Sequence, residues 1–127
     1  MIREIVIDKS SLIEEAEAFL AELNAIESKK EVLARRADGK TIREIAMSFG
    51  ITDERIRGIE AKIARKFAMS QRGRSIISAL SALSEANPEL TTDDLREFFG
   101  EHHDAVIYLL RLYKNSHFYN GKLEFIG

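Results

Sequence analysis

The chain has 127 residues, of which 45% are hydrophobic and 31% charged, as in one globular domain of ordinary size or two very small ones that share a core. It contains no cysteine, which excludes a disulfide scaffold, thiolate zinc sites and thiol catalysis. The longest apolar runs, such as Ala105–Leu110, are too short to span a bilayer, and Arg3 and Glu4 interrupt the N-terminus where a signal peptide would be apolar. These features predict a cytoplasmic protein with no membrane contact.

Charge is distributed unevenly along the chain. Residues 1–28 hold two basic and seven acidic residues, a net charge of −5, and residues 76–127 hold four basic and eight acidic residues, a net charge of −4. Between them, residues 29–75 hold thirteen basic and six acidic residues, a net charge of +7. A basic middle can attract a polyanion to one face, but a solvated surface whose parts neutralise each other is the alternative.

Residues 1–8 favour a short strand. Three pairs then fit a capping box, in which a Ser or Thr and a Glu three residues later cap the same helix. The pairs are Ser11 with Glu14, Ser28 with Glu31, and Thr41 with Glu44. They predict an amphipathic helix to about Ile26, a short basic helix stopped by Asp38-Gly39, and a third helix that Gly50 ends in a left-handed conformation.

The next helix is predicted from Thr52, which suits an N-cap. Its apolar residues recur at a spacing of three or four and form one stripe, namely Ile56, Ile59, Ile63 and Phe67. The connection Gly50-Ile51-Thr52 gives the two helices the proportions of a helix-turn-helix, in which we expect Ile51 and both apolar stripes to pack together. The opposite side of the second helix is then expected to face solvent.

That exposed side is predicted to carry small and basic residues, which a DNA major groove admits. Lys62 and Arg65 suit contacts to phosphate, and Arg57 suits phosphate or guanine. Glu54 suits a cytosine amine, and Ala61 suits a thymine methyl group. With the flanking helix ends and basic residues, the candidate DNA-binding residues are Thr41, Arg43, Thr52, Glu54, Arg55, Arg57, Gly58, Ala61, Lys62, Arg65, Arg72 and Arg74.

Residues 30–67 read KEVLARRADGKTIREIAMSFGITDERIRGIEAKIARKF. This segment resembles the C-terminal promoter-reading region of bacterial RNA polymerase sigma factors, and its most specific stretch is DERIRGIEAKIARKF, which follows the sigma pattern E-R-[IV]-R-x-I-E-A-K. The resemblance implies that the second helix enters the major groove of a promoter element and that the region docks on RNA polymerase. The chain has no counterpart of the sigma regions that melt promoters, so an ordinary complete sigma factor is not expected.

Two positions depart from the family pattern. At Asp53 the family usually has a basic residue that touches DNA, and at Gly58 it usually has a glutamine or similar polar residue that reads a base. Glycine within a helix costs about 1 kcal/mol relative to alanine, so close approach of DNA or a partner is a reason for Gly58. The departures imply a different sequence preference, DNA contact with little specificity, or a protein that binds polymerase and no longer reads DNA.

Beyond a predicted basic link at Gln71–Arg74, the C-terminal half has the order of a winged-helix module, a resemblance in layout only. The expected elements are a helix ended by Asn87-Pro88, a strand at Glu89–Thr91, a helix over residues 91–99, a longer helix over residues 101–115 and a hairpin turn at Asn120-Gly121. The helix over residues 101–115 is apolar nearly all round, which predicts burial against the N-terminal helix or against another subunit. The acidic balance favours dimerisation or partner docking over a second DNA reader, with the remainder of one core as the alternative.

Catalytic and metal sites have no positive support in the sequence. A zinc site built from His102, Asp104 and His117 is conceivable, but His102 and His103 are better explained as exposed residues in the first turn of a helix. No nucleophile elbow or phosphate-binding loop accompanies the serines. We therefore expect no enzyme activity, no metal and no cofactor.

The predicted fold class is mainly α, with a helix-turn-helix domain followed by a winged-helix-like module that has a C-terminal β-hairpin. The predicted segments are 1–28, an N-terminal strand and amphipathic helix; 29–70, the sigma-like helix-turn-helix domain; and 71–127, the dimerisation or docking module. The first hypothesis is a transcription regulator that binds double-stranded DNA as a homodimer. The alternatives are a sigma mimic that binds RNA polymerase through protein contacts, and a non-specific DNA-organising or segregation protein.

Overall fold

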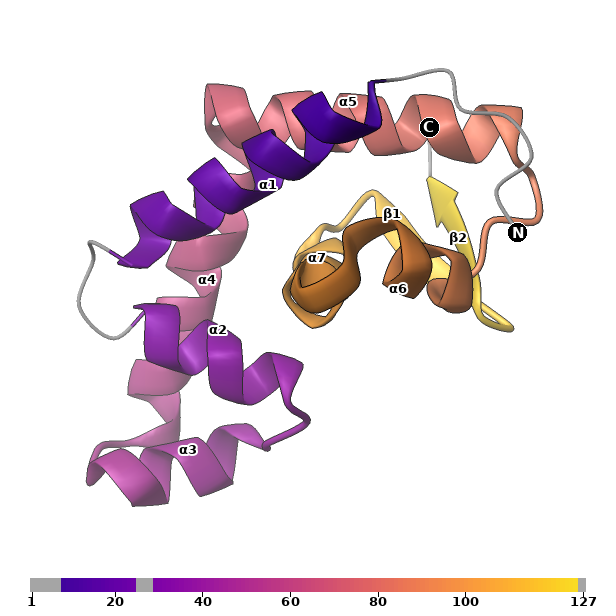
Figure 1. The fold of residues 1–127 in the computed structure, drawn as a ribbon. Helices are drawn as coiled ribbons and strands as arrows, with labels where there is room; N and C mark the ends of the chain where they lie inside the picture. Colours follow the sequence, from indigo (N-terminus) through magenta and orange to yellow (C-terminus); the bar gives the residue numbers. More distant parts are fainter. Residues whose placement is uncertain (1–7, 25–28, 126–127) are drawn as a thin grey trace.

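The computed structural model describes residues 8–24 and 29–125 and is mainly helical, as predicted (Figure 1). The helices are α1 Lys9–Asn24, α2 Lys29–Ala37, α3 Ile42–Phe49, α4 Asp53–Met69, α5 Gln71–Ala86, α6 Thr92–Phe99, the short 3-10 helix η1 Gly100–His102 and α7 His103–Leu112. The strands β1 Ser116–Tyr119 and β2 Lys122–Phe125 form an antiparallel hairpin. The strand predicted for the N-terminus and the capping residue Ser28 lie outside the described residues.

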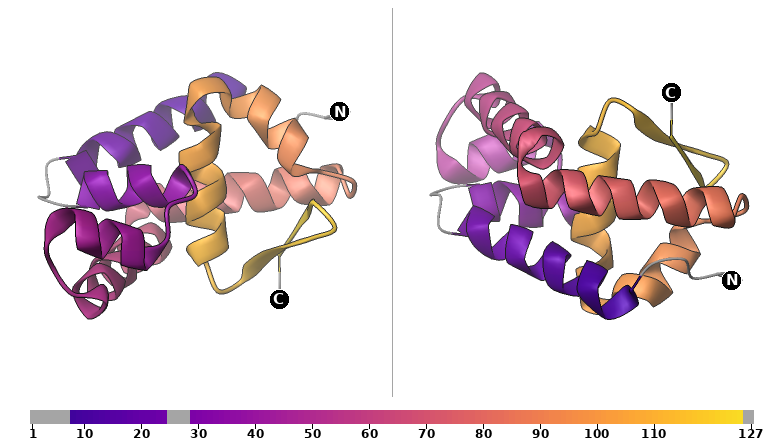
Figure 2. Two further views of the ribbon diagram at one scale, coloured as in Figure 1. Left: turned by 90° about the horizontal axis from the view of Figure 1, so that it is seen from below. Right: turned by 90° about the horizontal axis from the view of Figure 1, so that it is seen from above.

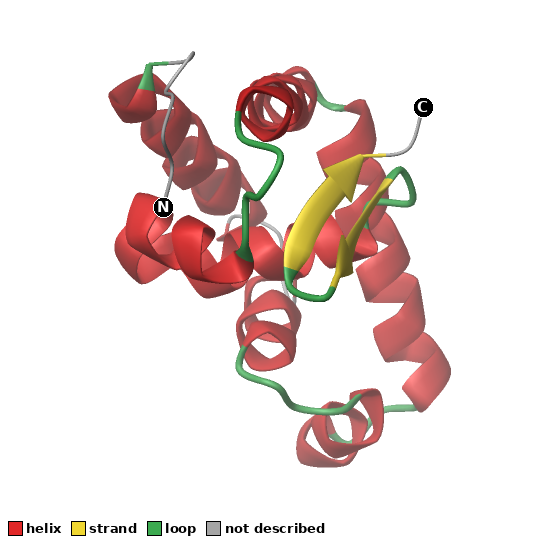
Figure 3. Ribbon diagram, turned by 90° about the vertical axis from the view of Figure 1, so that its right-hand side faces the viewer, coloured by secondary structure: helices red, strands yellow, loops and turns green. Residues whose placement is uncertain are grey.

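The helices are arranged around α7. α1 and α5 lie side by side, and α4 leads from the N-terminal end of α5 to the pair α2 and α3 (Figures 1 and 2). α7 contacts α2, α4, α6 and β1, while β2 contacts α5. Figure 3 shows the hairpin in front of these helices. This arrangement leaves α3 and α4 at one end of the molecule, away from the hairpin.

One hydrophobic cluster draws buried residues from every α-helix and from β2, so all three segments predicted from the sequence contribute to the same core. The predicted stripe of α4 is buried in it, which confirms the helical spacing. Phe67 is fully buried at the centre, with its ring 5.5 Å from that of Phe19 and 6.3 Å from that of Tyr113, both edge to face. Full burial of a side chain such as Phe19 or Phe67 stabilises the fold by about 1.5–3 kcal/mol.

Local capping signals decided most helix boundaries. Thr41 and Glu44 form the predicted capping box, and the Thr52 hydroxyl accepts from the Arg55 N–H at 3.2 Å. The prediction for Ser11 was wrong, because the Asp8 side chain caps α1 by accepting from the Ser11 N–H, and α1 begins at Lys9. An acidic residue just before the helix competes well for the free N–H groups of the first turn.

The predicted basic link at Gln71–Arg74 is instead the first turn of α5. Ser70 ends α4 and also caps α5, its hydroxyl accepting from the Gly73 N–H at 3.0 Å. A Cβ on Gly73 would lie 1.9 Å from the carbonyl oxygen of Phe67, so the two helices meet at this bend through their backbones. The sequence pattern missed this because the close approach joins two different helices.

The C-terminal half differs from the predictions in detail. The expected long helix is divided into η1 and α7, and α7 already ends at Leu112. Its central residues Val106–Leu110 are all buried, and its contacts lie within the chain rather than requiring a second subunit. The Glu89–Thr91 strand is reduced to one bridge between Thr91 and Lys122. The tight hairpin turn is confirmed, with positive φ at Asn120 and Gly121 (50° and 79°).

Candidate nucleic-acid interface

The turn between α3 and α4 has the geometry expected of a helix-turn-helix. Ile45 and Ala46 of α3 are buried where α3 contacts α4, and Gly50 reverses the chain with a φ of 69°. The Ile51 N–H donates to the carbonyl of Ala46 at 3.0 Å, which closes the turn. The prediction that Ile51 itself packs in the core was wrong, because it is 38% exposed.

α2 supports this unit from behind. The Arg35 guanidinium donates to the Ser48 hydroxyl at 2.8 Å and lies over the Phe49 ring at 4.6 Å. The Glu31 carboxylate is 3.6 Å from Arg35 on the same helix. These contacts tie α3 to α2, so the orientation of the helix-turn-helix is fixed by side chains as well as by the core.

The outward face of α4 is exposed along its whole length, as the helical period predicted. It consists of the six residues predicted from the period, Glu54, Arg57, Gly58, Ala61, Lys62 and Arg65, together with Arg55, which is also exposed. None of the four cations on this face makes an ion pair or a side-chain hydrogen bond with any residue that the structure describes. Their charges are therefore available to an external anion.

Other cations of the basic middle segment are already paired. Arg36 bonds Glu60 at 2.9 Å, and Lys66 lies 3.6 Å from Glu22. Arg43 of α3 is mostly exposed but approaches Asp53 of α4 at 3.8 Å. At the position where the sigma pattern has a basic residue, the chain therefore has a carboxylate that links the two helices.

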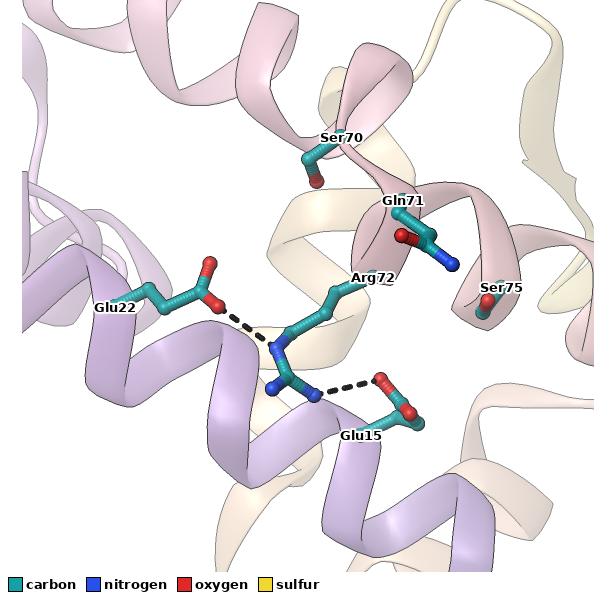
Figure 4. Close-up of a pocket in the computed structure, with 6 residues that line it drawn as sticks. All are labelled: Glu15, Glu22, Ser70, Gln71, Arg72 and Ser75. Carbon is teal, nitrogen blue, oxygen red and sulfur yellow. Dashed lines mark hydrogen bonds and ion pairs between the residues drawn. The ribbon is translucent and has the colours of Figure 1, made fainter.

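Arg72 lies on the α1 side of the molecule rather than on the outward face of α4. Its guanidinium donates to Glu22 at 2.7 Å and to Glu15 at 3.2 Å, beside a cavity of about 360 Å³ that Ser70, Gln71 and Ser75 also line (Figure 4). The hydrogen bond from Arg72 lowers the pKa of the Glu22 carboxyl. The charge of Arg72 is thus paired with two carboxylates, and we do not include Arg72 in the candidate interface.

Arg74, by contrast, is exposed on α5 and makes no ion pair among the described residues. Thr41 and Thr52 are exposed too, and their hydroxyl oxygens accept the capping bonds of α3 and α4. Each hydroxyl keeps its proton free to donate to a phosphate. Both residues also stand at helix N-termini, where the backbone favours an anion.

Gly58 has open space around it. No atom lies within 4 Å of the position that a Cβ would occupy, so packing within the chain does not require a glycine. The residue nonetheless weakens the helix by about 1 kcal/mol relative to alanine. A partner that approaches the backbone of α4 would explain the absence of a side chain.

The inward face of α4 carries a polar network that the sequence analysis did not find. Glu60 is buried, and one of its carboxylate oxygens accepts from both the Arg36 guanidinium and the Tyr108 hydroxyl. Burial raises the pKa of Tyr108 far above its ordinary value, so the phenol stays protonated and donates. The network joins α2, α4 and α7 behind the exposed face. The feature of the sequence that indicates this network is Glu60, a glutamate that follows Ile59 at the border of the apolar stripe.

The histidines have carboxylate neighbours. His102 and His103, which were predicted to be exposed, are half-buried, and His117 is exposed. Nε2 of His102 lies 3.5 Å from Glu17, and Nε2 of His117 lies 3.0 Å from Glu124. His103 contacts Asp104 at 2.9 Å. Among the residues that the structure describes, no group of three His, Asp or Glu side chains is placed to hold a metal ion.

No protein-family model, no curated protein and no solved structure matches this chain. Within the described ranges, no helix has the length and apolar character needed to cross a membrane. The geometry of the helix-turn-helix and the pairing of its charges therefore carry the functional argument.

Proposed function

We propose that the protein is a DNA-binding transcription regulator whose α4 enters the major groove of double-stranded DNA. The observation that carries the proposal is the contrast in charge pairing. The four cations on the outward face of α4 have no partner among the described residues, while Arg36, Lys66 and Arg72 are held by the chain's own carboxylates. Exposed and unpaired cations on one helix face are what a polyanion requires.

The shape of the face suits a groove about 12 Å wide. Gly58 and Ala61 let the helix approach base edges closely, because neither projects a long side chain. Lys62 and Arg65 are assigned to phosphates, and Arg57 to guanine or phosphate. Glu54 is assigned to a cytosine amine. Base contacts through these few residues would give sequence preference, while phosphate contacts would give most of the affinity.

The supporting end of α3 adds phosphate contacts. Thr41 can donate its hydroxyl proton at the N-terminus of α3, and Arg43 in the same turn, although 3.8 Å from Asp53, keeps three quarters of its side chain exposed. Arg55 lies exposed in the first turn of α4. These residues would fix the register of the protein on the duplex without reading sequence.

Selection of random duplexes by the purified protein tests the proposal. We expect one enriched motif, and the double variant Arg57→Ala/Lys62→Ala should bind it more weakly with a salt slope smaller by about two. Lys114→Ala is the matched control, because it removes an exposed cation at the other end of the chain.

Two outcomes would contradict the proposal. Salt-dependent binding without any enriched motif would favour a non-specific DNA-organising protein. Absence of DNA binding, together with retention of RNA polymerase by both the wild type and the double variant, would favour a sigma mimic that acts through protein contacts.

A further inference from the structure

The outward face of α5 is a second exposed surface, continuous with the end of α4. The inward face of α5 packs against α1, α4 and β2 through Gly73, Ile76, Leu80 and Leu83. Seen from above, no described element crosses over the helix on its other side (Figure 2). That outward face consists of Gln71, Arg74, Ser75, Ser78, Ser81, Ala82 and Glu85, all exposed or partly exposed.

Two shallow grooves flank the line formed by Arg74, Ser78 and Ala82. Met69, which is 70% exposed, lines one groove. Tyr113 lines the other, where Glu85 also lies. The small side chains between the two grooves would let another helix approach closely.

The charges of α5 run against its helix dipole. In α2, α4, α6 and α7 the first turn holds an acidic residue and the last turn a basic one, as the dipole favours. α5 has no acidic residue in its first turn and no basic residue in its last, with Arg74 near its start and Glu85 near its end. Neither of these two residues makes an ion pair among the described residues.

We propose that this face binds the same face of a second copy, with the two α5 helices antiparallel. A two-fold interface needs a self-complementary surface, and opposite charges at the two ends of one helix supply it. Arg74 of each copy would then meet Glu85 of the other, about 16 Å from the equivalent pair. Each Glu85 would also come to the positive N-terminus of the other α5, which reverses the unfavourable charge placement.

The size of the face indicates a weak contact in free solution. One helix face buries less than the roughly 800 Å² per partner of a standard stable complex. Two copies held on neighbouring DNA sites would have a much higher effective concentration, so the dimer should form mainly there. This part of the inference rests on the proposed DNA binding, whereas self-association itself does not.

The antiparallel arrangement also sets the two α4 helices apart. The C-terminus of α4 meets the N-terminus of α5. In the antiparallel pair the two α4 helices are therefore attached at opposite ends of the pair of α5 helices. α5 has 16 residues, and its ends are therefore about 24 Å apart. With the two helix axes about 8–10 Å apart, the two ends at which α4 meets α5 lie about 26 Å from each other, and α4 runs on from each end away from the contact (Figure 1).

Charge reversal tests the contact on the full chain without DNA. Sedimentation equilibrium at high protein concentration should show self-association of the wild type. Arg74→Glu and Glu85→Arg should each weaken it by about tenfold, and the double variant should recover it to within about threefold of the wild type. No self-association of the wild type up to about 1 mM, or no recovery in the double variant, would overturn the proposal.

Misfolding does not explain the expected losses. Both single substitutions favour the dipole of α5, so circular dichroism should show an unchanged or slightly higher melting temperature. On a duplex with two inverted sites, Glu85→Arg should lose cooperative binding but keep single-site affinity. If the double variant recovers self-association but the protein binds no DNA, the dimer is retained and the proposed function is rejected. If the protein binds single DNA sites but the double variant does not recover self-association, the proposed function is retained and the dimer is rejected.

Discussion

The two faces of α4 both carry charged residues, but among the described residues the charges are paired within the chain on one face and unpaired on the other. On the inward face, the carboxylate of Glu60 is buried and bound by Arg36 and Tyr108. On the outward face, Arg57, Lys62 and the neighbouring cations meet no described carboxylate. The net charge of a segment therefore does not say which of its charges are available to a ligand, because pairing in the tertiary structure decides that.

The largest effect is expected at Gly73, in the first turn of α5, where α5 meets the end of α4. Gly73→Ala should lower the free energy of unfolding by about 3 kcal/mol or more, because the new Cβ meets the backbone of Phe67. Urea unfolding of the variant and the wild type measures this difference in free energy. Gly58→Ala is the control, since it introduces the same side chain at an open position of a helix. Equal stability of the Gly73 variant and the wild type would show that the bend between α4 and α5 is not built as described.

The second largest effect is expected at Glu60, the buried carboxylate on the inward face of α4. Glu60→Ala should lower the free energy of unfolding by about 2–3 kcal/mol, because Arg36 and the buried Tyr108 hydroxyl lose their partner. Tyr108→Phe removes one hydrogen bond and should lower it by about 1 kcal/mol. Urea midpoints of both variants check the order, and a larger loss for Tyr108→Phe than for Glu60→Ala would contradict the shared-acceptor network.

Removal of an unpaired cation should weaken DNA binding more than removal of a paired one. Arg65→Ala should weaken binding to the selected duplex by about 1 kcal/mol, because it removes one of the phosphate contacts that we propose for the outward face. Arg72→Ala removes the same charge from the pair with Glu15 and Glu22, and its DNA affinity should stay close to that of the wild type. Fluorescence anisotropy compares the two, and equal losses would mean that pairing within the chain does not decide availability.

Gly58→Ala should move stability and binding in opposite directions. The free energy of unfolding should rise by about 0.5–1 kcal/mol, since alanine is the better helix former and nothing lies near its Cβ. Affinity for the selected duplex should fall, because the backbone of α4 can no longer approach as closely. Urea unfolding and anisotropy together check this, and unchanged affinity would remove the functional reason for the glycine.

The smallest effect is the acid sensitivity of the α1 contact. Arg72 lowers the pKa of Glu22 in the folded protein below its ordinary value of 4.5, so the unfolded chain takes up the proton first. The stability that this pair contributes is therefore present above pH 4.5 and is lost as the pH falls below it. Thermal unfolding at pH 7 and pH 3 should show a smaller acid-induced loss in Arg72→Ala than in the wild type.

Local sequence signals were sufficient for most of the elements. The capping box at Thr41, the N-cap at Thr52 and the left-handed Gly50 fixed α3, α4 and the turn between them. The three-four spacing of apolar residues also predicted which side of α4 faces solvent. Each of these signals depends on residues within about one helical turn of each other, which a single sequence displays directly.

Contacts between distant segments decided the rest. Arg72 is bound by carboxylates 50 and 57 positions away, and Glu60 finds Tyr108 48 positions along the chain. Gly73 is required by a backbone that only the bend of two helices brings near it. Local sequence patterns determined α3, α4, the turn between them and the exposed face of α4; the tertiary structure decided where α5 begins, how α7 is divided from η1 and which charges are neutralised within the chain, because these depend on distances that no local pattern encodes.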